Sequence, residues 1–204
     1  MFGDPVTNPK GWEVKPLGDS IDFLTSGSRG WSKFYASEGA LFLRIGNVGS
    51  GRLLMQDIQR VQAPNGAESR RTSVRAGDVL LSITADLGRA AVVTENLGQA
   101  HINQHLALIR LNGSLNSTFL TAFLTSKGGK QILLSKDKGG VKSGLNFDDI
   151  RSLKVFNASR QLQDDFEERL HAIEALRTKQ KNQNQLDDVL FNALLQKAFK
   201  GELT

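Results

Sequence analysis

The sequence contains no cysteine among its 204 residues. This absence excludes disulfide bonds, a thiol nucleophile and cysteine-rich zinc sites. No apolar run approaches the roughly 18 residues of a membrane-spanning helix, and residues 1–9 lack the basic and apolar regions of a signal peptide. The length fits one domain, or one domain with an appendage, and we expect a soluble, cytoplasmic protein.

Motifs of catalysis are also lacking. The sequence has no Gly-Lys-Ser or Gly-Lys-Thr phosphate loop, and the glycines of 46–51 have the wrong spacing for a dinucleotide loop. His101 and His105 lie four residues apart in a segment typical of a strand, with no third ligand nearby, and are expected to be structural. The acidic pair 148–149 fits a helix N-terminus, and the acid followed by Glu-x-Lys of many nucleases is absent. The sequence therefore favours binding over catalysis and predicts neither a metal site nor catalytic residues in this chain.

Glycine and proline become scarce after Asn157. Nineteen of the 20 glycines and all four prolines precede this residue. Residues 1–159 hold 19 Lys/Arg against 13 Asp/Glu, a net charge of +6, whereas residues 160–200 hold seven of each. We therefore predict a basic recognition domain at 1–158 and a neutral helix at 159–204. A basic globular part suits contact with phosphates, and a neutral helix suits contact with protein.

Short apolar runs between turn residues fill the first part. Four of them have the length and branched side chains of strands. They lie at 40–45, 78–84, 89–94 and 106–111. Asn116 or Ser117 is the expected N-cap of a helix that runs through 119–124 and ends before Gly128. Further elements are expected at 131–135 (a short helix), 146–150 (a capped turn) and 153–155 (a strand). These elements predict an α+β fold with a mostly antiparallel sheet and short helices.

The second part predicts one long helix. Ser159 suits its N-cap, acidic residues follow, and Gly201 marks its end. At 1.5 Å per residue, such a helix extends over roughly 60 Å, too long to pack on a small domain along its whole length. Its apolar stripe therefore needs a partner, most simply another long helix in a coiled coil. The partner-helix residues are Phe166, Leu170, Ile173, Leu176, Leu186, Leu190 and Leu194.

A polar stretch at 177–185 interrupts this stripe. It leaves open an alternative in which two shorter helices fold back as a hairpin. The stretch contains neither glycine nor proline, which favours a continuous helix.

Loop 25–35 is the first candidate for contact with DNA. Small residues let the backbone approach a phosphate, and Arg29 has the geometry to recognise guanine through two hydrogen bonds. The alternative is a surface turn in which Trp31 and Phe34 anchor the core. The candidates from this loop are Ser26, Ser28, Arg29, Trp31, Lys33 and Tyr35.

Two further groups complete the predicted DNA interface. The segment 126–144 combines five lysines with five glycines, a composition typical of a phosphate clamp or, alternatively, of a solvated loop. Other polar residues lie at predicted strand ends, whereas Arg70 and Arg71 are interpreted as exposed charge. The candidates are Lys136, Lys138 and Lys142 from the segment and Arg44, Asn47, Thr84 and Arg89 from the strand ends.

Six motifs, taken in their order along the chain, carry a resemblance to a known family. They are 1–19, 26–31, 40–47, 77–82, the pair Asn103-Gln104, and 191–203. Together they resemble the target-recognition domain and conserved helix of the specificity subunits of type I restriction–modification systems. The resemblance covers essentially the whole chain and rests on the combination of motifs.

This resemblance implies a non-catalytic subunit whose recognition domain reads one half of a bipartite DNA site. It also implies that long helices pair as an antiparallel coiled coil, space two recognition domains and dock methyltransferase subunits. Those partners bind S-adenosylmethionine and methylate adenine, and motor-nuclease subunits restrict unmodified DNA. No cofactor is expected in this chain itself.

The sequence departs from the family pattern in holding one recognition domain and one helix instead of two of each. We expect half of a longer chain, an internal-start product or a natural half-subunit. A half-subunit would dimerise through 160–200 and recognise a symmetric bipartite site, with 177–185 facing the methyltransferase or the helix crossing. Two other functions stay open, a protein-interaction adaptor that oligomerises through the helix and a small nuclease with scattered catalytic residues.

Overall fold

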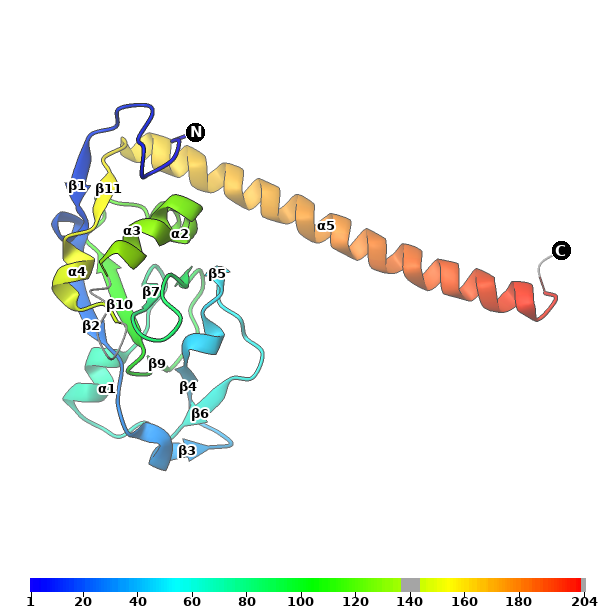
Figure 1. Ribbon diagram of the computed structural model, residues 1–204. Helices are drawn as coiled ribbons and strands as arrows, with labels where there is room; N and C mark the ends of the chain where they lie inside the picture. The colour runs from blue at the N-terminus through cyan, green and yellow to red at the C-terminus, as the bar shows by residue number, and fades with distance from the viewer. Residues whose placement is uncertain (137–143, 203–204) are drawn as a thin grey trace. The chain divides into compact units, whose positions relative to one another are not determined.

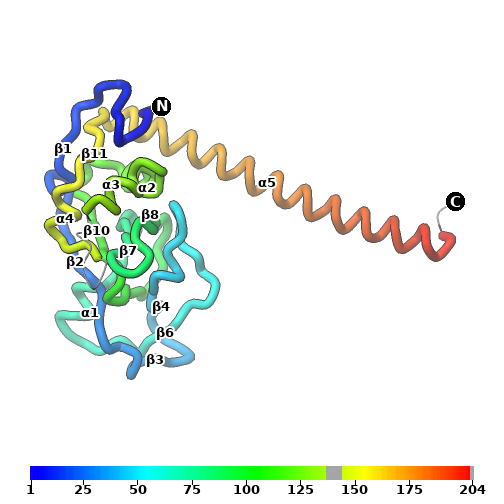
Figure 2. The backbone as a smooth tube through the Cα atoms, in the orientation of Figure 1, coloured from blue at the N-terminus to red at the C-terminus, as the bar shows by residue number. Residues whose placement is uncertain are grey.

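The computed structural model describes residues 1–136 and 144–202 (Figures 1 and 2). The chain divides into two compact units, Met1–Gln163 and Asp164–Thr204. Within the described ranges, no helix is both long enough and apolar enough to cross a membrane.

Three β-sheets form the framework of the first unit. The five-stranded sheet has the order β2 (Ile21–Ser26), β10 (Leu106–Leu111), β7 (Val79–Ser82), β8 (Ala90–Val92) and β5 (Ser50–Gly51). The four-stranded sheet has the order β3 (Tyr35–Ala36), β6 (Gln59–Val61), β4 (Ala40–Leu43) and β9 (Ala100–Ile102). The small sheet pairs β1 (Val14–Pro16) with β11 (Lys154–Phe156). Among the described strands, six pairs are antiparallel and two, β4–β9 and β5–β8, are parallel, which confirms the predicted α+β fold with mostly antiparallel sheets.

Short helices complete the first unit. The 3₁₀ helices are η1 (Leu17–Ser20), η2 (Trp31–Phe34) and η3 (Ile45–Asn47). The α-helices are α1 (Ala67–Thr72), α2 (Ser117–Thr125), α3 (Lys127–Ser135) and α4 (Phe147–Arg151). Helix α2 packs against β5, β8 and α3, and Figure 2 shows α2 beside α3 and β8.

The main hydrophobic core joins the two larger sheets. It combines Leu43 of β4 and Ile102 of β9 with Leu80 of β7 and Leu108 of β10, all fully buried. Burial of such side chains contributes about 25 cal/mol per Å² of apolar surface. Gly27 lets β2 end close to β9, because a Cβ there would lie 2.1 Å from the carbonyl oxygens of residues 102 and 103. The two sheets therefore lie in close contact where β2 and β9 end.

The predicted helix caps at Asn116 and Asn146 are confirmed, and so is the predicted end of the first helix before Gly128. The Asn116 side chain accepts hydrogen bonds from the backbone of Thr118 and Phe119 at the start of α2, and Asn146 forms a capping box with Asp149. Helix α2 ends at Thr125, but the next helix begins earlier than the predicted residue 131. Helix α3 begins at once after α2, and the second glycine of the pair, at 129, leaves room for the turn, since a Cβ there would lie 1.9 Å from the carbonyl oxygen of residue 123.

The second unit consists almost entirely of helix α5 (Arg160–Phe199), a single helix of 40 residues. The hairpin alternative is therefore wrong. The first turn of α5 belongs to the first unit, because Gln163 is 2% exposed and its side chain accepts from the backbone of Asn116 and donates to Ala158. These hydrogen bonds explain why the first unit extends to Gln163, beyond the boundary predicted at residue 158.

Candidate nucleic-acid interface

Four loops meet where strands of both larger sheets end. They follow β2 (26–30), β4 (44–47), β7 (83–89) and β9 (103–105). Antiparallel pairing places the ends of β2 and β7 on either side of the start of β10. Parallel pairing places the ends of β4 and β9 side by side. We call these four loops the strand-end surface.

Hydrogen bonds connect the four loops directly. A bridge joins Ser28 to Asn103, and the backbone nitrogen of Asn103 donates to the carbonyl of Leu43 at the end of β4. Arg89 links the loop after β7 to the residue that directly follows the loop after β4, since its Nη1 lies 3.5 Å from the carbonyl oxygen of Val48. The strand-end surface is therefore one connected feature of the fold, built from segments up to 79 residues apart in sequence, from 26 to 105.

The turn after β7 has an unusual backbone. Ala85 has φ = +61°, a conformation that side chains other than glycine rarely adopt. The turn is held by the Ser82 hydroxyl, which donates to the carbonyl of Asp86 and accepts from the backbone of Arg89 at 3.0 Å. The Arg89 side chain also forms an ion pair with Asp86. Strain maintained by surrounding contacts is frequent at binding sites.

A hollow with a volume of about 380 Å³ opens on the strand-end surface. It is lined by Arg44, Ile45, Gly46, Asn47, Gln56, Asp57, Asn103 and His105. The Arg44 guanidinium is oriented by Asp57, because Nη2 donates to the backbone carbonyl at 3.0 Å and to Oδ2 at 3.2 Å. Asn47 is only 2% exposed, and its side chain bonds to the backbone of residues 44, 54 and 56. Asn47 therefore shapes the hollow, while Arg44 remains half-buried at its rim.

Gln104 and His105 belong to this surface, although neither was among the predicted contacts. Nδ1 of His105 lies 2.7 Å from Oγ1 of Thr84, and its Nε2 lies 3.0 Å from Nε2 of Gln104. The sequence carried a signal for them in the Asn103-Gln104 motif. The expectation that His105 is purely structural does not account for its place at the mouth of the hollow.

The structure separates the candidates of loop 25–35. Arg29 and Lys33 are exposed, whereas Ser28 is fully buried, and its Oγ is one of two buried side-chain atoms without a partner among the described residues. Trp31 is 3% exposed and stacks on Phe42 with ring centroids 5.7 Å apart, which favours its alternative role as a core anchor.

Tyr35 lies away from the strand-end surface. It pairs with Val61, which also faces Ala40 at the beginning of β4, whereas Arg44 follows the end of that strand (Figure 1). Ser26, the last residue of β2, is half-buried at the surface and accepts a hydrogen bond through its carbonyl from Arg71. Arg71 also donates to the hydroxyl of Thr25, so it supports the end of β2 and is more than the exposed charge expected for it.

His101 is structural, as expected. It is 6% exposed on β9, where Nδ1 lies 3.1 Å from Oγ1 of Thr72 and the Trp31 ring packs edge-on at 5.2 Å. Burial lowers the pKa of His101, and a hydrogen bond with Ser69 opposes this shift in part. The histidine therefore favours its neutral form inside the fold.

Helix α3 adds basic residues to the strand-end surface. The stem of Lys130 packs over Gly88, since a Cβ on that glycine would lie 3.2 Å from Cγ of the lysine. Lys136 follows the end of α3 and is half-buried. The candidates Lys138 and Lys142 lie outside the described residues. Within the described ranges, the basic side chains of this part of the molecule include Arg29, Arg44, Arg89 and Lys130. Two of them are paired with acids, Arg44 with Asp57 and Arg89 with Asp86.

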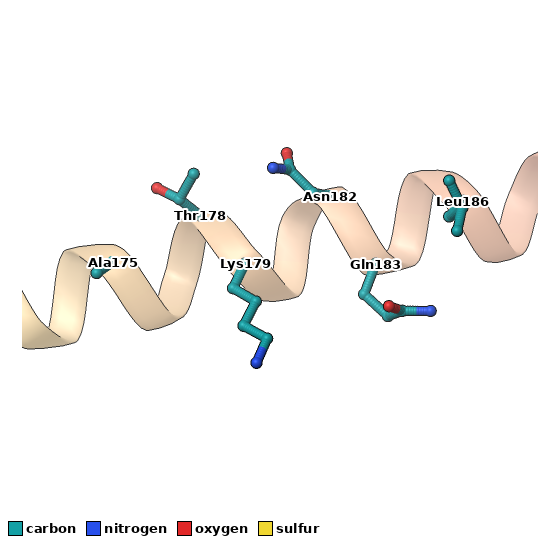
Figure 3. Close-up of a pocket in the computed structure, with 6 residues that line it drawn as sticks. All are labelled: Ala175, Thr178, Lys179, Asn182, Gln183 and Leu186. Carbon is teal, nitrogen blue, oxygen red and sulfur yellow. The ribbon is translucent and has the colours of Figure 1, made fainter.

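Helix α5 presents exposed apolar side chains along the second unit. Those of its C-terminal half are between 44% and 86% exposed: Leu186, Val189, Leu190, Phe191, Leu194, Leu195 and Phe199. The polar stretch of the helix carries a shallow, open hollow (Figure 3). Its side chains include Thr178 and Asn182 on one side of the helix and Lys179 and Gln183 on the other. An exposed apolar surface of this extent is typical of helices that pack against a partner.

Comparison with known proteins identifies relatives of this chain. No family model matches it. In sequence, it is 25% identical over 174 residues to the specificity subunit of the type I restriction enzyme EcoBI from Escherichia coli. The match covers 82% of this chain and 36% of the relative, so this chain spans about a third of the relative's length.

Solved structures share the fold. The HsdS subunit from Thermoanaerobacter tengcongensis is 24% identical with a TM-score of 0.61, and the match covers 96% of this chain and 46% of that chain. A chain of a type I restriction–modification system, solved for its complex assembly and conformational transition, is 22% identical with a TM-score of 0.64 and coverages of 96% and 47%. Sequence and fold together confirm the resemblance predicted from the motifs.

Proposed function

We propose that this chain, a homologue of type I restriction–modification specificity subunits, recognises duplex DNA through its strand-end surface and has no catalytic role. The observation that carries the proposal is the convergence of four separate loops, with an excess of basic side chains, on one surface of a rigid domain. Loops held by a rigid scaffold are where proteins most often place binding residues. We also propose that the chain acts in the cytoplasm, where the DNA that it recognises is located.

The chemistry of the strand-end surface suits both parts of DNA recognition. Arg89 and Lys130 supply charge for phosphates, which fix the position of a protein on the duplex. Arg29 and Arg44 are long, planar donors suited to the O6 and N7 atoms of guanine. Asp57 restrains Arg44 and so lowers the entropy lost when it binds.

We further propose that α5 pairs with a second long helix and docks methyltransferase subunits, which would bring S-adenosylmethionine and the methylation chemistry. Its exposed apolar side chains support a protein contact. The second helix belongs either to another copy of this chain or to a specificity half of the same type, so that two recognition domains address a bipartite site. A motor-nuclease subunit would join the same assembly where restriction accompanies methylation.

A salt titration of duplex binding tests the DNA part of this proposal. About four phosphate contacts predict that affinity falls about 100-fold between 50 and 200 mM salt. Lys33→Ala and Lys130→Ala should each weaken binding and flatten the slope of log affinity against log salt by about 0.9. Arg29→Ala should weaken binding chiefly by relaxing the preference at one guanine. Arg177→Ala, which removes the same charge from α5, is the matched control and should leave the slope unchanged.

The adaptor alternative predicts a different result. An adaptor would keep its helix-mediated assembly and show no duplex binding at low salt, even with methyltransferase subunits present. Metal-dependent cleavage of DNA by the purified chain alone would instead support the nuclease alternative.

A further inference from the structure

A chain of side-chain hydrogen bonds on the strand-end surface fixes the orientation of Gln104. Its Nε2 lies 3.0 Å from Nε2 of His105, and Nδ1 of His105 lies 2.7 Å from Oγ1 of Thr84. The backbone supports both ends of this chain. The nitrogen of His105 donates to Oδ1 of Asn103 at 3.2 Å, and a bridge to Gly144 holds Thr84 beside the strained Ala85.

The direction of these hydrogen bonds follows from the donors available. An amide nitrogen only donates, so Nε2 of His105 accepts from Gln104. The imidazole then carries its proton on Nδ1 and donates it to the Thr84 hydroxyl. One donor of the Gln104 amide is thereby used, and the plane of the amide is restrained by the histidine ring.

The other half of the Gln104 amide remains available. Its Oε1 and second N–H have no partner among the described residues. Oε1 is not buried, because the buried side-chain atoms without a partner in the described ranges are Ser28 Oγ and Thr121 Oγ1. Gln104 as a whole is half-buried. Solvent therefore reaches the acceptor Oε1, and the second N–H of the same amide lies in one plane with it, with the oxygen and nitrogen about 2.3 Å apart by the standard geometry of an amide.

We propose that Gln104 recognises an adenine in the major groove, with His105 and Thr84 as the residues that position it. Adenine presents the N6 amino donor beside the N7 acceptor, and a glutamine amide matches this pair with two hydrogen bonds. Guanine presents two acceptors at the same place and would set O6 against Oε1. The proposal rests on the DNA-binding function proposed above and assigns it a base and a residue.

Positioning by His105 is what makes this glutamine selective. A free glutamine side chain rotates and loses conformational entropy when it binds, whereas a restrained one loses less. The restraint also sets which side of the amide faces outward as donor and which as acceptor. Thr84 contributes by accepting from Nδ1 and so keeping Nε2 of the ring unprotonated.

Competitive selection of duplexes by the full chain, together with its methyltransferase subunits, tests the proposal. The bound site is first defined for the unsubstituted protein. Affinity is then compared for duplexes in which one adenine is replaced by guanine or by 7-deazaadenine, which lacks the N7 acceptor but pairs normally with thymine. At one adenine we expect each replacement to weaken binding about tenfold.

Gln104→Ala should remove the penalty at that adenine and leave the preferences at every other position unchanged. Gln99→Ala is the matched control, because Gln99 is an exposed glutamine that precedes β9 just as Gln104 follows it. Retention of every adenine penalty by Gln104→Ala would overturn the proposal. So would a uniform loss of affinity for all sequences, which is the result of a phosphate contact.

The positioning role has its own measurements. Thr84→Val should reduce the penalty at the same adenine without changing the salt dependence, and Thr84→Ser should restore it. Long-range ¹H–¹⁵N NMR of His105 should show the proton on Nδ1, and a proton on Nε2 would contradict the hydrogen-bond direction. If the unsubstituted protein shows no sequence preference at all, the proposed function itself fails, a result separate from the others.

Discussion

The two units of this chain differ in how far they bury their apolar side chains. In the first unit, Leu80, Ile102 and Leu108 are fully enclosed by neighbouring strands. In the second unit, Leu190 is 59% exposed and Phe191 is 64% exposed. The first unit carries 20 basic against 13 acidic residues, whereas the second carries six against eight.

This difference separates the tasks of the two units. A domain with its own core is stable by itself and leaves its surface free for a charged ligand such as DNA. A single helix gains little stability from its own hydrogen bonds, and most helices in proteins depend on packing of an apolar face. The charge of the first unit and the apolar surface of the second therefore point to different partners.

Removal of one core side chain is the most severe test of this comparison. Trp31→Ala deletes a ring that packs against Phe42 and His101, and should lower the free energy of unfolding of the first unit by about 3–5 kcal/mol. Phe191→Ala on α5 removes an exposed ring and should change that free energy by less than about 0.5 kcal/mol. Urea denaturation measures the difference. Circular dichroism follows unfolding in both variants, and tryptophan fluorescence follows it in Phe191→Ala, which keeps Trp31.

The milder variant Trp31→Phe distinguishes a core anchor from a DNA contact. A phenylalanine keeps an aromatic ring against Phe42 and loses the weak hydrogen bond from Nε1 to Glu68. We expect its DNA affinity to equal that of the unsubstituted chain. A loss of affinity with unchanged stability would move Trp31 back into the interface.

A charge on the apolar side of α5 tests the second half of the comparison. Leu190→Asp places a carboxylate where a partner helix is expected, and burial of an unpaired charge costs about 3 kcal/mol or more. The dissociation constant of the assembly should rise at least about 100-fold, while the first unit melts as before. Light scattering or sedimentation measures the mass, and Leu170→Asp is a second variant, at a predicted partner-helix residue in the N-terminal half of α5.

Asn192→Asp is the matched control for Leu190→Asp. Two residues correspond to a rotation of about 200° around the helix, so the same charge is added on the opposite side. An unchanged mass for both leucine variants would remove the basis for a helix-mediated assembly.

The sequence predicted elements whose signal is local. Branched side chains between turn residues identified β4, β7, β8 and β10, and the cap residues Asn116 and Asn146 marked the starts of α2 and α4. Helix α5 followed from spacing and from the absence of glycine and proline. The short strands β3 and β5, of two residues each, have no pattern of their own and exist because neighbouring strands pair with them.

The candidate site was less predictable because it depends on pairing between distant strands. The strand-end positions Arg44, Thr84 and Arg89 were recognisable as ends of individual strands. Nothing local shows that residue 84 meets residue 105, and that contact depends on the register of β7 against β10. Likewise, the burial of Trp31 follows from the packing of η2 on β4, which loop composition does not encode.

Titration of His101 is expected to have the smallest effect on stability, and this effect should concern the first unit alone. Because burial lowers its pKa in the fold below the ordinary value of 6.5, the unfolded chain takes up a proton that the folded chain excludes. Stability of the first unit should therefore fall as the pH drops below 6.5, by at most about 1.4 kcal/mol per pH unit for one proton. His101→Gln should flatten this dependence in denaturation curves recorded between pH 7.5 and pH 5, whatever it does to stability at neutral pH. His171→Gln, at an exposed position of α5, is the matched control. An acid slope that survives His101→Gln would assign the effect to other groups and would show that the core around Trp31 tolerates a charged histidine.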